Sequence, residues 1–153
     1  MLPPRTIVRR LLSFPLPVPG AGRTVLNIAL RVVAAALLIA VAAWAVPGLG
    51  HFLLWRWGRA VVFFLGVSTF AVLGVVLRGH IFTLQSSDAF ELLGFLSNIG
   101  AGAYYFAAKY LVADAADVSR AAGDYGTRFF AAAGVLNLLC VLDALDIASG
   151  RKE

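Results

Sequence analysis

Residues 44–59 read Trp44-Ala-Val-Pro-Gly-Leu-Gly-His-Phe-Leu-Leu-Trp-Arg-Trp-Gly-Arg59 and separate two long apolar stretches. Proline removes a helical hydrogen-bond donor and glycine permits a tight reversal, so this stretch predicts a turn between two helices. Its tryptophans are typical of the aromatic belt at a membrane surface. We therefore expect two membrane helices to meet here at one interface. We call the following set the turn motif: Pro47, Gly48, Gly50 and His51.

The composition supports a membrane protein. Of the 153 residues, 61% are hydrophobic and 14% are charged, and the mean hydropathy is +0.87. A soluble domain is roughly 45–50% apolar and about 25% charged. These values exclude a soluble globular domain, a disordered chain and a coiled coil, and the single cysteine, Cys140, excludes a disulfide scaffold. The chain is expected to be an all-α integral membrane protein.

Four stretches are apolar enough to be spans, since a helix crosses a bilayer core of about 30 Å with about 20 apolar residues. They are residues 26–46, 60–77, 92–108 and 129–148. Between the last two, residues 113–122 mix acids and an arginine with alanine, which predicts a short amphipathic helix on the membrane surface. The expected fold is a small bundle of four transmembrane helices over residues 25–150, with this surface helix between spans three and four.

The N-terminal segment, residues 1–24, carries four arginines and five of the six prolines. The prolines interrupt its apolar part, so it lacks the apolar core of a signal peptide and predicts a flexible basic arm. The formal charge of the chain is +5, but its arginines flank apolar runs, where they meet lipid headgroups rather than nucleic acid. The distribution of basic residues favours both termini in the cytoplasm.

Charged residues near the ends of the spans predict a polar seam. Asp143 and Asp146 are three residues apart and share a helix face. An unpaired charge at membrane depth costs roughly 2.5–3.5 kcal/mol. In a chain of four spans, Arg31 and Arg78 fall on the same side as the acids, so we expect at least one acid to contact one of these arginines. The alternative is that all four side chains reach headgroups and water separately.

Few polar side chains offer chemistry at membrane depth. His51 and His80 are the candidates for cofactor binding, because neutral imidazole can ligate a pigment magnesium. They lie at opposite ends of the second span and have no cysteine, histidine or glutamate cluster nearby, so no metal site, resident cofactor or catalytic residue is expected. Asn98 and Asn137 are amides that each need a partner on a neighbouring helix.

A second motif lies near the C-terminus and reads Ala133-Gly-Val-Leu-Asn137-Leu-Leu-Cys-Val-Leu-Asp143-Ala-Leu-Asp146-Ile-Ala-Ser-Gly-Arg151-Lys152. Together with the turn motif, it resembles an uncharacterised family of small bacterial multi-span membrane proteins with a Pro-Gly-Leu-Gly-His turn. That family is distantly similar to the TM-two domain, a two-helix membrane hairpin. The resemblance implies a bacterial inner-membrane protein and implies no known activity.

Three functions remain open. The leading hypothesis is a non-enzymatic scaffold or accessory subunit of a membrane complex, because small-residue helix faces are present and a catalytic constellation is not. The first alternative is a small ion or proton transporter or channel subunit that uses Asp143 and Asp146, since intramembrane acids mark ion paths. The second alternative is a pigment-binding accessory subunit that uses His51 or His80. The expected partners are membrane lipids and other membrane subunits, without nucleic acid or a soluble small-molecule substrate.

Overall fold

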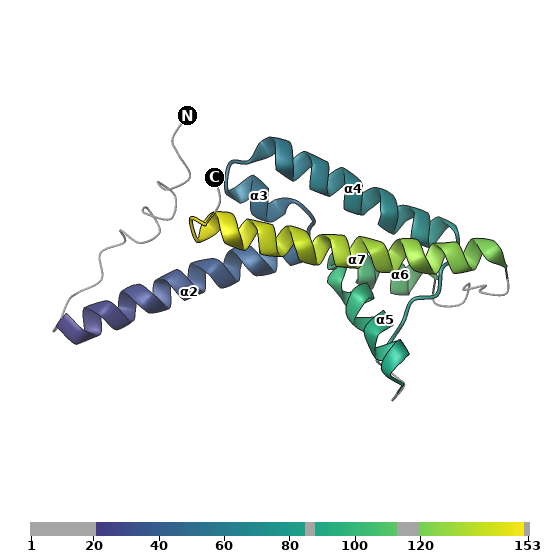
Figure 1. Cartoon of the computed structure of the whole chain (residues 1–153), viewed down its shortest axis with the longest axis horizontal. Helices are drawn as coiled ribbons and strands as arrows, with labels where there is room; N and C mark the ends of the chain where they lie inside the picture. The colour runs from purple at the N-terminus through teal and green to yellow at the C-terminus, as the bar shows by residue number, and fades with distance from the viewer. Residues whose placement is uncertain (1–20, 85–87, 113–119, 152–153) are drawn as a thin grey trace.

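The computed structural model describes residues 21–84, 88–112 and 120–151 (Figure 1). Every regular element within these ranges is a helix. The helices are α2 (Ala21–Ala45), α3 (Leu49–Leu53), α4 (Trp57–Val76), α5 (Ala89–Gly100), α6 (Ala103–Val112) and α7 (Ala121–Ala148).

In the described part of the chain, three helices are long and apolar enough to cross a membrane. They are the Thr24–Ala45 part of α2, the whole of α4 and the whole of α7. These helices contain or closely match the predicted spans 26–46, 60–77 and 129–148. The last of them begins earlier than expected, because α7 is one continuous helix of 28 residues.

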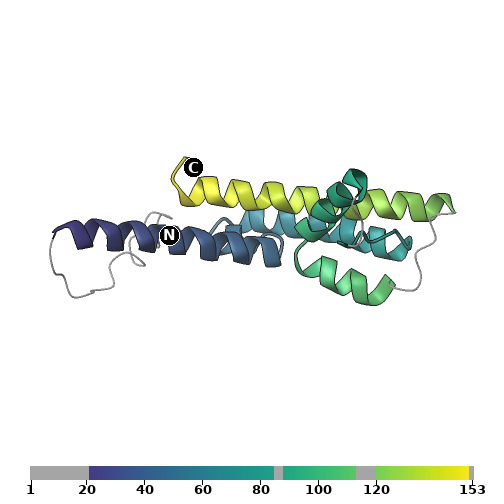
Figure 2. The same ribbon diagram turned by 90° about the horizontal axis from the view of Figure 1, so that it is seen from below.

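The predicted third span, 92–108, is not a single helix. It is divided between α5 and α6, which have 12 and 10 residues, so the expected count of four spanning helices is not confirmed. The break falls at Gly102, whose φ is +63°. A side chain there would collide with the carbonyl oxygen of Trp44, and only glycine adopts this conformation at little cost. Figure 2 shows α6 turning away from α5 after the break.

Two predicted features lie mainly outside the described residues. The N-terminal arm, 1–24, is described only from residue 21, where α2 begins. The surface helix expected at 113–122 is described only from residue 120, and residues 121–122 form the start of α7.

α7 is the common neighbour of the other long helices, and both α2 and α4 run antiparallel to it (Figures 1 and 2). At the end of α4, Gly74 packs on Phe130, and a Cβ on that glycine would lie 2.7 Å from the Phe130 Cβ. The absence of a side chain at Gly74 therefore lets the two helices approach closely. The buried core between α4, α6 and α7 includes Val67, Ala71, Ala108, Phe130 and Ala133.

Because α2 and α4 run in the same direction, the segment between them must reverse twice. Gly48 makes the first reversal with a φ of +81°, and Trp55 makes the second with a φ of +61°. The five residues of α3 lie between these two points. The single turn expected between two successive spans is therefore wrong. This difference changes which helix ends lie on the same side of the bundle.

Asn137 joins two helix ends to α7. Its Nδ2 donates hydrogen bonds to the carbonyl oxygens of Trp44 and Gly100, both at 2.9 Å. The last carbonyls of a helix have no partner within that helix. The Asn137 amide therefore supplies a hydrogen-bond donor to one such carbonyl at the end of α2 and to one at the end of α5. Trp44 Nε1 in turn donates to the Ile99 carbonyl oxygen at 2.9 Å. The expectation that Asn137 finds its partners on neighbouring helices is confirmed.

The crossing of α5 and α7 is predicted to be sensitive to one methyl group. A Cβ at Gly134 would fall on the Ser97 carbonyl oxygen, so Gly134→Ala should lower the free energy of unfolding by about 1–3 kcal/mol through overpacking. The control is Gly66→Ala, because nothing lies within 4 Å of a Cβ there and alanine favours the helix by up to about 1 kcal/mol. Thermal unfolding in detergent measures both, and equal stability of the two variants would contradict the close crossing.

Candidate functional site

The turn motif holds α3 against two other helices. Gly50 is buried, and a Cβ there would lie 2.7 Å from the Cβ of Ala43 on α2 and 3.0 Å from that of Ala144 on α7. Gly48 lies similarly close to the Ala60 carbonyl at the start of α4. The small residues thus bring His51, the next residue along α3, to the C-terminal part of α7.

His51 pairs with Asp143 at this point. His51 Nε2 lies 3.0 Å from Asp143 Oδ2, and Arg59 Nη1 lies 3.4 Å from the same oxygen. The three side chains come from α3, α7 and the first turns of α4. When the carboxyl is ionised, Nε2 donates the hydrogen bond to it and the pair can hold a proton between its two members. We call these three residues the His51 cluster.

The surroundings of His51 are closed. Its side chain is 0% exposed, whereas Asp143 is 20% exposed and Arg59 is 44% exposed. The Phe63 ring covers one face of the imidazole, with ring centroids 4.7 Å apart and planes inclined at 45°. His51 Nδ1 is buried and has no hydrogen-bond partner among the described residues. Within the described ranges, Nε2 is bonded to Asp143 and neither imidazole nitrogen is bonded to a hydroxyl or thiol that it could activate.

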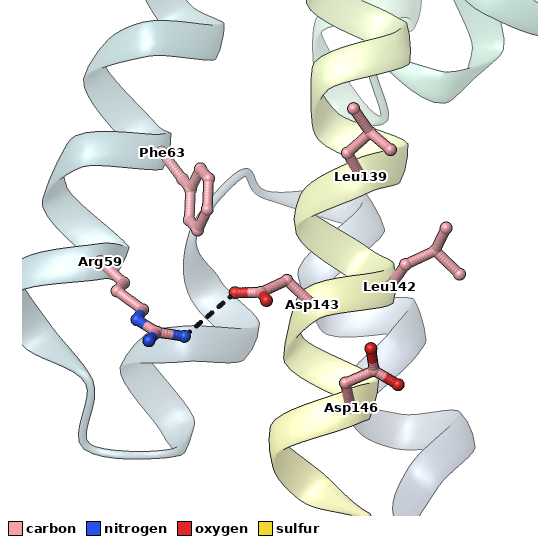
Figure 3. A pocket seen from close by; sticks show the side chains of 6 residues that line it. All are labelled: Arg59, Phe63, Leu139, Leu142, Asp143 and Asp146. Atoms are coloured by element: carbon pink, nitrogen blue, oxygen red, sulfur yellow. Dashed lines mark hydrogen bonds and ion pairs between the residues drawn. The ribbon is translucent and has the colours of Figure 1, made fainter. Parts of the chain in front are cut away.

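Asp143 also faces an open cavity between α4 and α7, which we call the Asp143 cavity (Figure 3). Its volume is about 670 Å³. It is lined by Arg59, Phe63, Leu139, Leu142, Asp143 and Asp146. Asp146 lies on the same side of α7 as Asp143, and its Oδ1 is 3.8 Å from Nη1 of the exposed Arg151.

The structure separates one member of the predicted polar seam from the acids. Arg78 follows the end of α4, where the adjacent Gly79 packs against Gly126 near the start of α7. Asp143 lies near the other end of α7, so the expected pairing of Arg78 with the acids is wrong. The error comes from the assumed direction of α4. Arg31 lies on α2 on the same side of the bundle as the acids, and its contact with them stays a prediction.

The remaining candidates lie apart from the His51 cluster. His80 is exposed, its ring packs edge-on against Phe82 at 4.9 Å, and it lines a cavity of about 710 Å³ near the start of α7. The His51 ring is enclosed, and pigment binding by either histidine stays a prediction. In the described ranges no group of three or more His, Cys, Asp or Glu side chains is arranged to hold a metal ion. Asn98 is fully buried, and neither of its side-chain polar atoms has a partner in this part of the chain.

The pairing of His51 with Asp143 was not predicted, although both residues were singled out. They belong to the turn motif and to the C-terminal motif, which are about ninety residues apart in the chain. Arg59 is one of the arginines that flank apolar runs and are expected to meet headgroups, whereas the structure pairs it with Asp143. The signal that could have joined them is the pair of small residues, Gly50 and Ala144, which indicates that α3 and α7 approach closely.

A family model described as a family of unknown function (DUF6677) matches residues 38–153. The match covers both the turn motif and the C-terminal motif. The chain matches no curated protein and no solved structure.

The His51–Asp143 pair should be energetically coupled. His51→Leu and Asp143→Ala should each lower the free energy of unfolding by about 1–3 kcal/mol, because each removes one member of the pair and leaves the other without this partner. The double variant should lose little more than the larger single loss. The matched control is the exposed pair of Arg128 and Asp124, at 2.7 Å, whose removal should cost less than about 1 kcal/mol. Strictly additive losses at His51 and Asp143 would show that the two residues are independent.

Proposed function

The chain belongs to this family of unknown function, and we propose that it is a non-enzymatic subunit of a bacterial inner-membrane complex that docks to its partner through α2. The observation that carries the proposal is the position of α2. In the most apolar stretch of 18 residues in α2, only 6% is buried, compared with 44% in the corresponding stretch of α7. Most of α2 therefore has little packing within its own chain.

The placement of α2 along the bundle argues for a protein neighbour. Trp44 at the end of α2 lies level with Asn137, whereas Arg59 at the start of α4 lies level with Asp143. At about 1.5 Å of rise per residue, the centres of the two apolar helices are offset by roughly 16 Å along α7. The part of α2 before Ile39 projects past the end of α7 (Figure 1). A bilayer core is only about 30 Å thick, so a partner would cover this projecting part where the rest of the bundle does not.

The projecting part of α2 has large apolar side chains on its surface. Ile39 is the first large residue of α2 that packs against the core cluster around Ala144. The preceding turns expose Val25, Leu26, Ile28, Leu30, Val32 and Val33. Without a core of its own, such a helix is suited to packing against another membrane helix through close van der Waals contact.

Among the described residues no hydroxyl or thiol is bonded to His51 Nδ1, which favours a non-enzymatic role. The proposed orientation keeps both termini in the cytoplasm. It is supported by Arg56 and Arg59, because the direction of α4 brings them to the same end of the bundle as Arg151. Basic residues concentrate on the cytoplasmic side of membrane proteins.

Site-specific cross-linking tests the docking role of α2. A photoreactive residue replacing Leu30, which is 57% exposed on α2, should capture a defined second polypeptide in native membranes. The control is the same residue at Val62, which is 68% exposed on α4 and should be surrounded by lipid. Mass spectrometry of the adducts distinguishes another subunit from a second copy of this chain. Capture at neither position, or equally at both, would contradict the proposal.

A second candidate, a proton or ion path, is favoured by one observation: Asp143 pairs with buried His51 and also lines an open cavity of about 670 Å³. Acids within membrane helices often mark such paths. Proteoliposomes with a pH-sensitive dye inside test it. Flux above that of empty liposomes should be lost in Asp143→Asn and kept in Asp124→Asn at the other end of α7. Wild-type flux equal to that of empty liposomes would exclude this candidate.

A further inference from the structure

The Asp143 cavity changes character along the axis of the bundle. Figure 3 shows Phe63 and Leu139 at one end of it, Arg59 and Asp143 at its middle, and Asp146 at the other end. Phe63 is one turn further into α4 than Arg59, and Leu139 is one turn further into α7 than Asp143. The charged part therefore lies near the helix ends and the apolar part faces the middle of the helices, as headgroup and acyl chain do in a lipid leaflet.

The charges in this cavity are mixed. Its lining contains one guanidinium, Arg59, and two carboxylates, Asp143 and Asp146, which are three residues apart on one helix face. A carboxylate can accept about four hydrogen bonds, so an ammonium group would share Asp143 with His51 and Arg59, and would share Asp146 with the exposed Arg151. The cavity thus offers donors for a phosphate and acceptors for an ammonium group at neighbouring positions.

We propose that the Asp143 cavity binds phosphatidylethanolamine. The ammonium group of the headgroup lies between the carboxylates of Asp143 and Asp146, and the phosphate accepts hydrogen bonds from Arg59. The first part of an acyl chain packs on Phe63, Leu139 and Leu142. This site is separate from the docking role of α2, and either proposal can fail without the other.

The chemistry of the cavity discriminates among lipids. A phosphatidylglycerol headgroup brings a negative charge and no ammonium, so the two carboxylates disfavour it. A phosphatidylcholine headgroup has a quaternary ammonium without N–H groups, and it cannot donate hydrogen bonds to the carboxylates. A lone divalent cation is less suitable, because the described residues provide no cluster of three acidic, histidine or cysteine ligands.

Native mass spectrometry of the full chain in detergent, titrated separately with phosphatidylethanolamine, phosphatidylglycerol and phosphatidylcholine, tests the proposal. Phosphatidylethanolamine should bind about tenfold more tightly than either of the others, which corresponds to about 1.4 kcal/mol. Equal affinities for the three lipids would overturn the proposal. Soluble phosphoethanolamine at the same concentration should not displace the lipid, and full displacement would show that the acyl part of the proposed site is wrong.

Variants locate the site. Asp146→Asn removes one charge from a half-exposed side chain and should abolish most of the preference for phosphatidylethanolamine, and Arg59→Gln should weaken binding of this lipid about tenfold. Asp124→Asn, at an exposed carboxylate on the opposite end of α7, should leave the preference unchanged. Thermal unfolding of each variant confirms that the fold is kept. A preference that survives in Asp146→Asn, or that is lost equally in Asp124→Asn, would overturn the assignment to this cavity.

Discussion

The two hydrogen bonds donated by Asn137 are the constraint on which the arrangement of the helices depends. Inside an apolar bundle a backbone carbonyl without a partner is costly, because water is not there to replace the missing bond. α2 and α5 both end within the bundle, and the Asn137 amide pairs with a carbonyl from each. Fixing these two ends on α7 places Gly102 against Trp44 and determines where the chain must turn back toward α4.

The apolar helices were predictable because hydropathy and length report directly on the ability to cross a membrane. The sequence indicated α2, α4 and α7, and it indicated that Asn137 needs a partner. It did not indicate the break at Gly102, since glycine is also common in unbroken membrane helices. The direction of α4 was missed because a turn rich in proline and glycine suggests one reversal, whereas Trp55 makes a second one. With a single reversal, Arg78 would lie on the same side of the bundle as Asp143, whereas the structure has Arg59 there.

The turn motif and the C-terminal motif form one structural unit. Gly50 packs on Ala144, and the next residue, His51, bonds to Asp143, the residue before that alanine. The two contacts connect α3 and α7 side by side, one through close packing and the other through a polar pair. A candidate site built in this way is held by rigid elements rather than by a loop, which favours precise positioning of its charged groups.

The central position of α7 has a consequence for biosynthesis. This helix packs against α2, α3, α4 and α5, yet it follows all of them in the chain, so they leave the ribosome before their main packing surface exists. Asn137 and Asp143 then become available within a few residues of each other, and both helix ends and the His51 cluster can be completed almost together. Until that moment the carbonyls of Trp44 and Gly100 lack the donor that Asn137 provides, and lipid acyl chains have no N–H or O–H group to replace it. Assembly of this bundle is therefore completed only once α7 has been made, and a chain that stops before residue 137 lacks the amide that joins the ends of α2 and α5.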